Sequence, residues 1–275
     1  MMRHRRFCAT ALGAVHIVEA GPRDAPDVVL LHQTPRSSDE YAEVVDILGV
    51  DHHVIAIDTI GYGCSDHVFT QPTIADYAEG VVRVLQQIGV SRATLVGHHT
   101  GAFIALEVAA IAPDCVTGVL LSGPVFMDDE TRPRYAPWFV QWHPDAEGTH
   151  LHDKWSRLGR WAAEPAMRQR LLADVFRAGE TSEQGHAAIL AYEMAERLPL
   201  VHAPALLLYA DADPFVDITQ VSRFAQLLRH TAVEQTDGGI FLPTERPEAF
   251  SDIVRRFVDT LGVRARALAI APDTS

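Results

Sequence analysis

The chain has 275 residues, and 48% of them are hydrophobic, which is enough for one large core or a core domain with an inserted lid. The formal net charge of -13 at pH 7 argues against nucleic acid and anionic membranes as partners, because such a surface repels both. The three cysteines are widely spaced, so we expect free thiols in a reducing cytoplasm rather than a disulfide framework.

The first half of the chain is expected to alternate between strands and helices. The basic stretch at residues 1–6, with apolar residues after it, is also typical of an export signal, but the apolar run is short and we favour a hairpin around Gly13. No apolar run approaches membrane-spanning length. The predicted strands are 6–10, 15–19, 27–32, 54–58, 94–96 and 116–121, and the predicted helices are 38–48, 74–88 and 99–111.

The alternation stops between residues 128 and 200, where only helices are predicted, around 137–142, 151–163, 166–177 and 182–197. All four tryptophans lie in this segment. It resumes with strands at 205–209 and 232–235 and helices at 218–228 and 247–261. Strand–helix alternation implies parallel strands with crossover helices. We therefore predict an α/β core domain of residues 1–127 and 201–263, a helical cap of residues 128–200 and a C-terminal tail of residues 264–275.

Five short motifs follow one another in an order that resembles the α/β-hydrolase superfamily over roughly residues 6–262. They are His32-Gln33-Thr34-Pro35, similar to the oxyanion turn; residues 58–66, similar to a D-x-x-G-x-G-x-S-D loop; residues 97–101, similar to the G-x-S-x-G nucleophile elbow; residues 210–213, similar to the G-x-x-D turn of the acid; and residues 238–241, similar to a G-G-H-F ending. The resemblance implies an α/β-hydrolase fold: a mostly parallel central sheet with helices on both faces and an inserted helical cap.

Two catalytic positions depart from the family pattern. His99 stands where the nucleophilic serine belongs, and Ile240 stands where the catalytic histidine belongs. Because an isoleucine side chain cannot accept a proton, a Ser-His-Asp mechanism is excluded at the matched positions. The elbow glycines Gly97 and Gly101 are nevertheless present, and a strained turn of this kind is usually retained for function.

An imidazole reaches about 2 Å further from the backbone than a serine hydroxyl. We therefore expect His99 to extend towards the gap left at Ile240 and to meet Asp213, which leaves its other ring nitrogen for a substrate or a water. Such a dyad could act as a general base for water, or remove a proton from carbon or a hydroxyl, and direct attack by His99 is a third route. An inactive elbow in a ligand-binding protein is the remaining interpretation.

The resemblance also supplies the other candidate site residues. The backbone N–H groups of Thr34 and Thr100 would form an oxyanion hole. Substrate contacts are expected from six side chains: His32, Gln33, Trp138, Phe139, Trp142 and Ile240. We expect Asp58 to brace its loop and His98 to take no part in chemistry, and we expect neither a metal nor a cofactor.

The predicted function is cofactor-free cleavage of a small apolar carbonyl compound: an ester, a lactone or the C–C bond of a dicarbonyl. A lyase, eliminase or decarboxylase with the same residues is the alternative within enzymes. The predicted partner is a small hydrophobic or aromatic substrate, a homodimer is left open, and the expected location is the cytoplasm.

Overall fold

The computed structural model describes residues 2–139, 143–162 and 164–270. Within these ranges one sheet has the strand order β1-β2-β4-β3-β5-β6-β7-β8. The pairs β1–β2 and β2–β4 are antiparallel, and all later neighbours are parallel. The strands are β1 (His4–Thr10), β2 (Gly13–Ala20), β3 (Asp27–Leu31), β4 (His53–Ile57), β5 (Ala93–His98), β6 (Val116–Ser122), β7 (Ala205–Ala210) and β8 (Thr231–Thr236). Each predicted strand is present, and the sheet is mostly parallel as expected.

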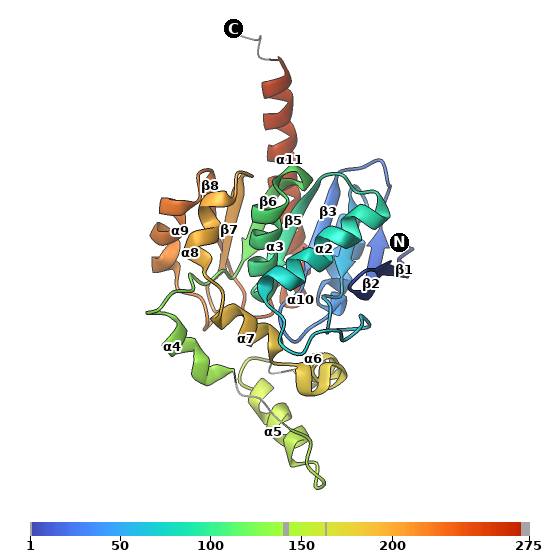
Figure 1. Ribbon diagram of the computed structural model, residues 1–275, viewed down its shortest axis with the longest axis vertical. Coiled ribbons are helices and arrows are strands. Elements are labelled where there is room, and N and C mark those ends of the chain that lie inside the picture. The colour runs from blue at the N-terminus through green and yellow to red at the C-terminus, as the bar shows by residue number, and fades with distance from the viewer. Residues whose placement is uncertain (1, 140–142, 163, 271–275) are drawn as a thin grey trace.

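Both faces of the sheet are covered by helices, as Figure 1 shows. The helices α2 (Ile74–Ile88) and α3 (Thr100–Ile111) pack on one face, and α1 (Ala42–Leu48), α10 (Leu242–Glu245) and α11 (Pro247–Ile270) pack on the other; α9 (Val221–Leu227) lies beside β7 and β8. A hydrophobic core lies on each face of the sheet, and the side chains of β3 alternate between the two. Val29 and Leu31 face α2 and α3, whereas Val28 and Leu30 face α1 and α11. This period of two explains why the strand is apolar throughout.

The described residues between β6 and β7 form helices and no strand. They are α4 (Arg132–Tyr135), α5 (Thr149–Leu158), α6 (Pro165–Ala178), α7 (Gln184–Leu190) and α8 (Met194–Arg197), and Figure 1 shows α4 to α7 gathered beyond one end of the sheet. The first cap helix begins earlier than predicted, at Arg132, because Pro133 suits the first turn of a helix. The predicted helix at 137–142 is replaced by a 3-10 turn at Ala136–Trp138, and residues 140–142 lie outside the described residues.

Polar and steric contacts join the cap to the loops at the end of the sheet. Asp174 of α6 accepts hydrogen bonds from Arg36 Nε at 2.9 Å and from Ser37 Oγ at 2.7 Å. Gly185 of α7 lies so close to the oxyanion turn that a β-carbon there would be 2.0 Å from Thr34 Oγ1. The cap is therefore seated directly over the ends of the strands.

The last helix is longer than predicted. α11 continues to Ile270 rather than ending near Leu261, so the segment predicted as a tail is helical over residues 264–270. Its alanine, arginine and leucine residues are strong helix formers, which accounts for the extension. No helix among the described residues is long and apolar enough to cross a membrane.

Candidate active site

The turn between β5 and α3 holds His99 in a strained backbone conformation. Its φ is 46° and its ψ is -109°, and it is the one described non-glycine residue with positive φ. A β-carbon at Gly97 would lie 2.1 Å from the carbonyl oxygen of Gly101, and one at Gly101 would lie 1.9 Å from that of Leu31. Both glycines are therefore required for the close approach of strand and helix, which presents residue 99 at the tip of the turn.

The side chain of His99 reaches the carboxylate that follows β7. Its Nε2 lies 2.8 Å from Oδ2 of Asp213, and the side chains are 14% and 0% exposed. Neither atom has another hydrogen-bond partner among the described residues, so the two groups are each other's close partner, and the pair is ionic when His99 is protonated. The second carboxylate oxygen accepts the backbone N–H of Phe215 at 2.9 Å.

This pairing changes the acidity of both groups. Burial alone would lower the pKa of His99, but the charge and contact of Asp213 outweigh it and raise that pKa above its usual value. Burial alone would raise the pKa of Asp213, but His99 outweighs it and lowers that pKa. The imidazole is thus a stronger base than a free histidine, and Asp213 stays ionised beside it.

His98 lies next to His99 but is held in the protein interior. Its Nδ1 lies 2.9 Å from Ser122 Oγ, and its Nε2 lies 2.9 Å from the carbonyl oxygen of Ile240. Burial, together with the charge of His99, lowers the pKa of His98 to about 4. The ring is therefore neutral at pH 7, and hydrogen bonds hold both of its nitrogens inside the protein.

The oxyanion turn lies beside the elbow. The Thr34 N–H donates to Thr100 Oγ1 at 3.2 Å, so the two residues expected to form the oxyanion hole are in contact. The Thr100 N–H belongs to the first turn of α3, where a helix leaves its N–H groups without intrahelical partners. A substrate oxygen bound by both N–H groups would replace the Thr100 hydroxyl as the acceptor for Thr34.

Gln33 and His32 differ in their relation to the site. The Gln33 amide donates to Glu40 Oε1 at 2.6 Å and to the Ile240 carbonyl at 3.1 Å, and its side chain lines the cavity described below. His32 is not among the residues that line the cavity. Its Nε2 accepts the Thr59 N–H at 3.0 Å, which leaves Nδ1 to donate to the Gln33 carbonyl at 2.9 Å.

A cavity of about 150 Å³ lies between the elbow and the cap. An apolar cavity of about this size holds a benzene-sized ligand. His99, Thr34, Thr100, Gln33 and Ile240 line its floor, and the predicted aromatic residues Trp138 and Phe139 line it from the cap. Trp142, also predicted to contact substrate, lies outside the described residues.

Several residues at the site were not identified from the sequence. A β-carbon at Gly123 would lie 3.0 Å from His99 Nε2, so this glycine makes room for the imidazole. Others line the cavity, among them Lys154, Arg157, Glu183, His186 and Phe215. The sequence held one signal that could have drawn attention to these positions: Lys154 is the only lysine of the chain.

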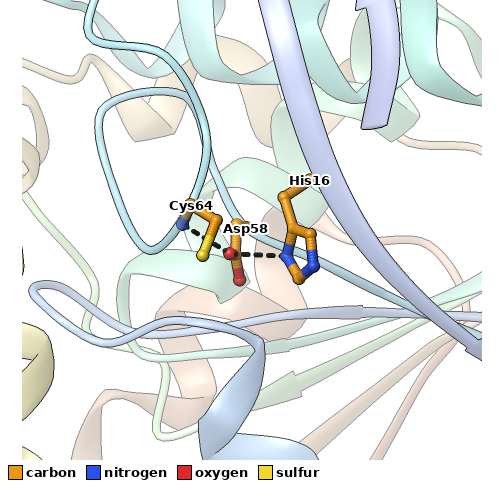
Figure 2. Close-up of side chains that lie close together, drawn as sticks. All are labelled: His16, Asp58 and Cys64. Atoms are coloured by element: carbon orange, nitrogen blue, oxygen red, sulfur yellow. Dashed lines mark hydrogen bonds and ion pairs between the residues drawn. The ribbon is translucent and has the colours of Figure 1, made fainter. Parts of the chain in front are cut away.

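A second group of side chains with metal-ligand chemistry lies away from this cavity. It consists of His16, Asp58 and Cys64, whose candidate ligand atoms lie within 4.8 Å of one another (Figure 2). Asp58 Oδ2 accepts from His16 Nδ1 and from the Cys64 N–H, both at 2.8 Å, and Oδ1 accepts from the Ser38 N–H at 2.6 Å.

Those hydrogen bonds satisfy Asp58, which therefore braces its loop as expected. Burial alone would raise the pKa of Asp58, but the hydrogen bond from His16 and the two backbone donors outweigh it and lower that pKa to about 2. The guanidinium of Arg177 lies 2.8 Å from the Cys64 sulfur and would oppose a bound cation. We therefore do not assign a metal to this cluster.

Comparison with known proteins agrees with this geometry. Residues 26–242 match the family model described as the alpha/beta hydrolase fold. The chain belongs to this family. It is 28% identical over 214 residues to a bifunctional esterase/perhydrolase of Acinetobacter calcoaceticus, covering 71% of this chain and 77% of the relative. It is 23% identical over 270 residues to a carboxylesterase of Bacillus subtilis, covering 92% and 86%.

A solved structure extends the likeness in fold. The enol-lactonase from Burkholderia xenovorans superposes with a TM-score of 0.72 at 23% identity, over 92% of this chain and 100% of that structure. These relatives support a hydrolase-type enzyme.

Proposed function

We propose that this protein is a cofactor-free hydrolase of small apolar carbonyl compounds, with esters and lactones as the first substrates to test. The observation that carries the proposal is the 2.8 Å pairing of His99 with Asp213 at the floor of a cavity with aromatic walls. Relatives that cleave esters and a neighbour that is an enol-lactonase favour acyl transfer over elimination or decarboxylation.

In this proposal, His99 acts as a general base through its free ring nitrogen. The neutral imidazole keeps its proton on Nε2, facing the Asp213 carboxylate, which leaves the lone pair on Nδ1. Nδ1 removes a proton from a water, and the resulting hydroxide attacks the carbonyl carbon. The carbonyl oxygen becomes an oxyanion that the N–H groups of Thr34 and Thr100 stabilise. When the intermediate collapses, the imidazolium returns the proton to the departing oxygen, so His99 ends as it began.

The cavity restricts the substrate. Its volume of about 150 Å³ suits a compound near the size of a substituted benzene, and its aromatic lining favours an apolar body. Ile240 contributes an apolar wall where the family carries its catalytic histidine.

The proposal is tested by screening phenyl esters and small lactones with the wild type, His99→Ala and Asp213→Asn. We expect hydrolysis by the wild type and a loss of about 10²- to 10⁴-fold in turnover in His99→Ala, with the variants still folded by circular dichroism. A fluorophosphonate probe for catalytic serines should leave the elbow peptide unlabelled. Equal turnover by the wild type and His99→Ala would contradict the proposal.

A further inference from the structure

The cap side of the cavity carries charged groups for which the His99 chemistry has no use. Lys154 Nζ of α5 lies 3.1 Å from Glu183 Oε1, and His186 Nδ1 of α7 lies 2.7 Å from Glu183 Oε2. The three side chains are only 13%, 13% and 18% exposed for Lys154, Glu183 and His186. All three line the same cavity as His99. Charged groups are rarely placed in an apolar cavity without a ligand or a partner that requires them.

Positive charge exceeds negative charge on this side of the cavity. Among the described residues that line it, Lys154 and Arg157 are cationic and Glu183 is the one carboxylate. Burial lowers the pKa of Lys154 despite the opposing attraction of Glu183, so the carboxylate does not fully offset the cost of burying the ammonium. An anion at this position would stabilise the ammonium further.

Aromatic side chains connect this charged side with the rest of the cavity. The Phe139 ring stacks on the His186 imidazole with centroids 4.2 Å apart and an interplanar angle of 3°. Phe215 packs against Trp138 at 5.5 Å and against Trp161 at 5.6 Å. The cavity therefore presents polar groups at its floor, an aromatic wall and a second set of polar groups on the cap.

We infer that Lys154 and Arg157 form a subsite for a carboxylate, so that the ligand is an amphipathic anion with a small apolar body between its charged group and its reacting carbonyl. The placing of the carbonyl at His99 rests on the proposed function, whereas the anion subsite does not depend on turnover. A lysine ammonium is compact and can turn towards a single carboxylate oxygen, and a guanidinium can bind the same group through two N–H donors.

The subsite is tested by titration calorimetry with benzoate and its neutral isostere benzamide, against four proteins: the wild type, Lys154→Met, Lys154→Arg and Arg160→Met. Arg160 is an exposed residue just after α5 that does not line the cavity, so its variant removes one positive charge from the same segment of the cap. We expect the wild type to bind benzoate about tenfold more tightly than benzamide, as a charge-assisted hydrogen bond would give.

The preference should fall to about one in Lys154→Met and persist in Lys154→Arg and Arg160→Met. Unchanged benzamide affinity in Lys154→Met would show that the cavity is intact. Equal binding of the two ligands by the wild type, or a preference for benzoate that survives in Lys154→Met, would overturn the inference.

The single lysine gives a second, independent measurement. Apart from the N-terminus, Lys154 is the only amine, so an amine-acylating reagent followed by peptide mass spectrometry reports on it alone. Benzoate should slow its acylation more than benzamide does. The same titrations with His99→Ala should retain the preference for benzoate, so a failed hydrolysis screen and a failed anion subsite can be told apart.

Discussion

Gly123 faces the imidazole of His99 across the candidate site: a β-carbon at position 123 would lie 3.0 Å from Nε2 and 3.1 Å from Cε1 of that ring. Position 123 also has a φ of +63°, which L side chains rarely adopt. The glycine follows β6, next to the strand that carries the elbow, and the imidazole occupies the space where its side chain would be. Replacing serine by histidine at the elbow is thus matched by open space at a neighbouring strand end.

Gly123→Ala should therefore displace the His99 ring from Asp213 and lower turnover. The matched control is Gly89→Ala at the end of α2, where φ is +76° and a β-carbon would meet nothing within 4 Å. Both variants should lose about 1–2 kcal/mol of unfolding free energy from backbone strain, measured by urea denaturation. Only Gly123→Ala should also lose activity, and equal activity of the two variants would contradict this role for Gly123.

The pH profile of kcat/KM tests the His99–Asp213 pair directly. As a general base, His99 must be neutral, so the rate should rise with pH through a pKa that Asp213 holds above the usual histidine value. Asp213→Asn removes the negative charge that raises this pKa, so the inflection should move to lower pH while the plateau falls. An inflection at the same pH in both proteins would assign the titration to another group.

Much of this site could be predicted because the fold dictates where strand ends lie. Val28–Leu31 reads as a strand buried on both faces, and β5 and β7 end at the same edge of the sheet, which brings His99 near Asp213. The cap positions could not be found this way. Helical periodicity predicts that α5 and α7 exist, but not which of their faces lines the cavity. Nothing in the sequence therefore marked Glu183 and His186 as residues of the site.

The orientation of the His32 side chain could not be predicted, for a related reason. Motif position places the residue at the turn, but its orientation depends on the Thr59 N–H, a partner that lies in a different loop. A hydrogen bond between two loops leaves no periodic trace in the sequence.

The two adjacent histidines should contribute to stability with opposite pH dependence. The folded-state pKa of His98 is lowered to about 4, so between about pH 6.5 and 4 the unfolded chain binds a proton that the folded chain does not. His98 therefore reduces stability as the pH falls through that window. The folded-state pKa of His99 is raised, so its contribution is present at low pH and is lost as the pH rises through that value.

His98→Asn should consequently be less stable than the wild type at pH 7, by about 1–3 kcal/mol, because Ser122 and the Ile240 carbonyl lose well-placed partners. The difference between the two proteins should narrow on acidification from pH 6.5 to 4. Unfolding by guanidinium chloride at several pH values measures this. A constant difference across the range would show that His98 does not titrate as described.

The double variant His99→Ser with Ile240→His tests whether the remaining parts of an ordinary serine-hydrolase site are in place. It would restore a serine at the elbow and a histidine between that serine and Asp213, and the backbone carbonyl of Ile240 that holds His98 and Gln33 need not move. We expect hydrolysis of 4-nitrophenyl acetate and labelling of residue 99 by a fluorophosphonate. Neither single change should be labelled by the fluorophosphonate, since His99→Ser has no base to activate the serine and Ile240→His has no serine at the elbow. If the double variant folds but stays unlabelled, the position of Asp213 or of the oxyanion turn differs from that in serine hydrolases, and the present histidine site has to be understood without reference to a triad.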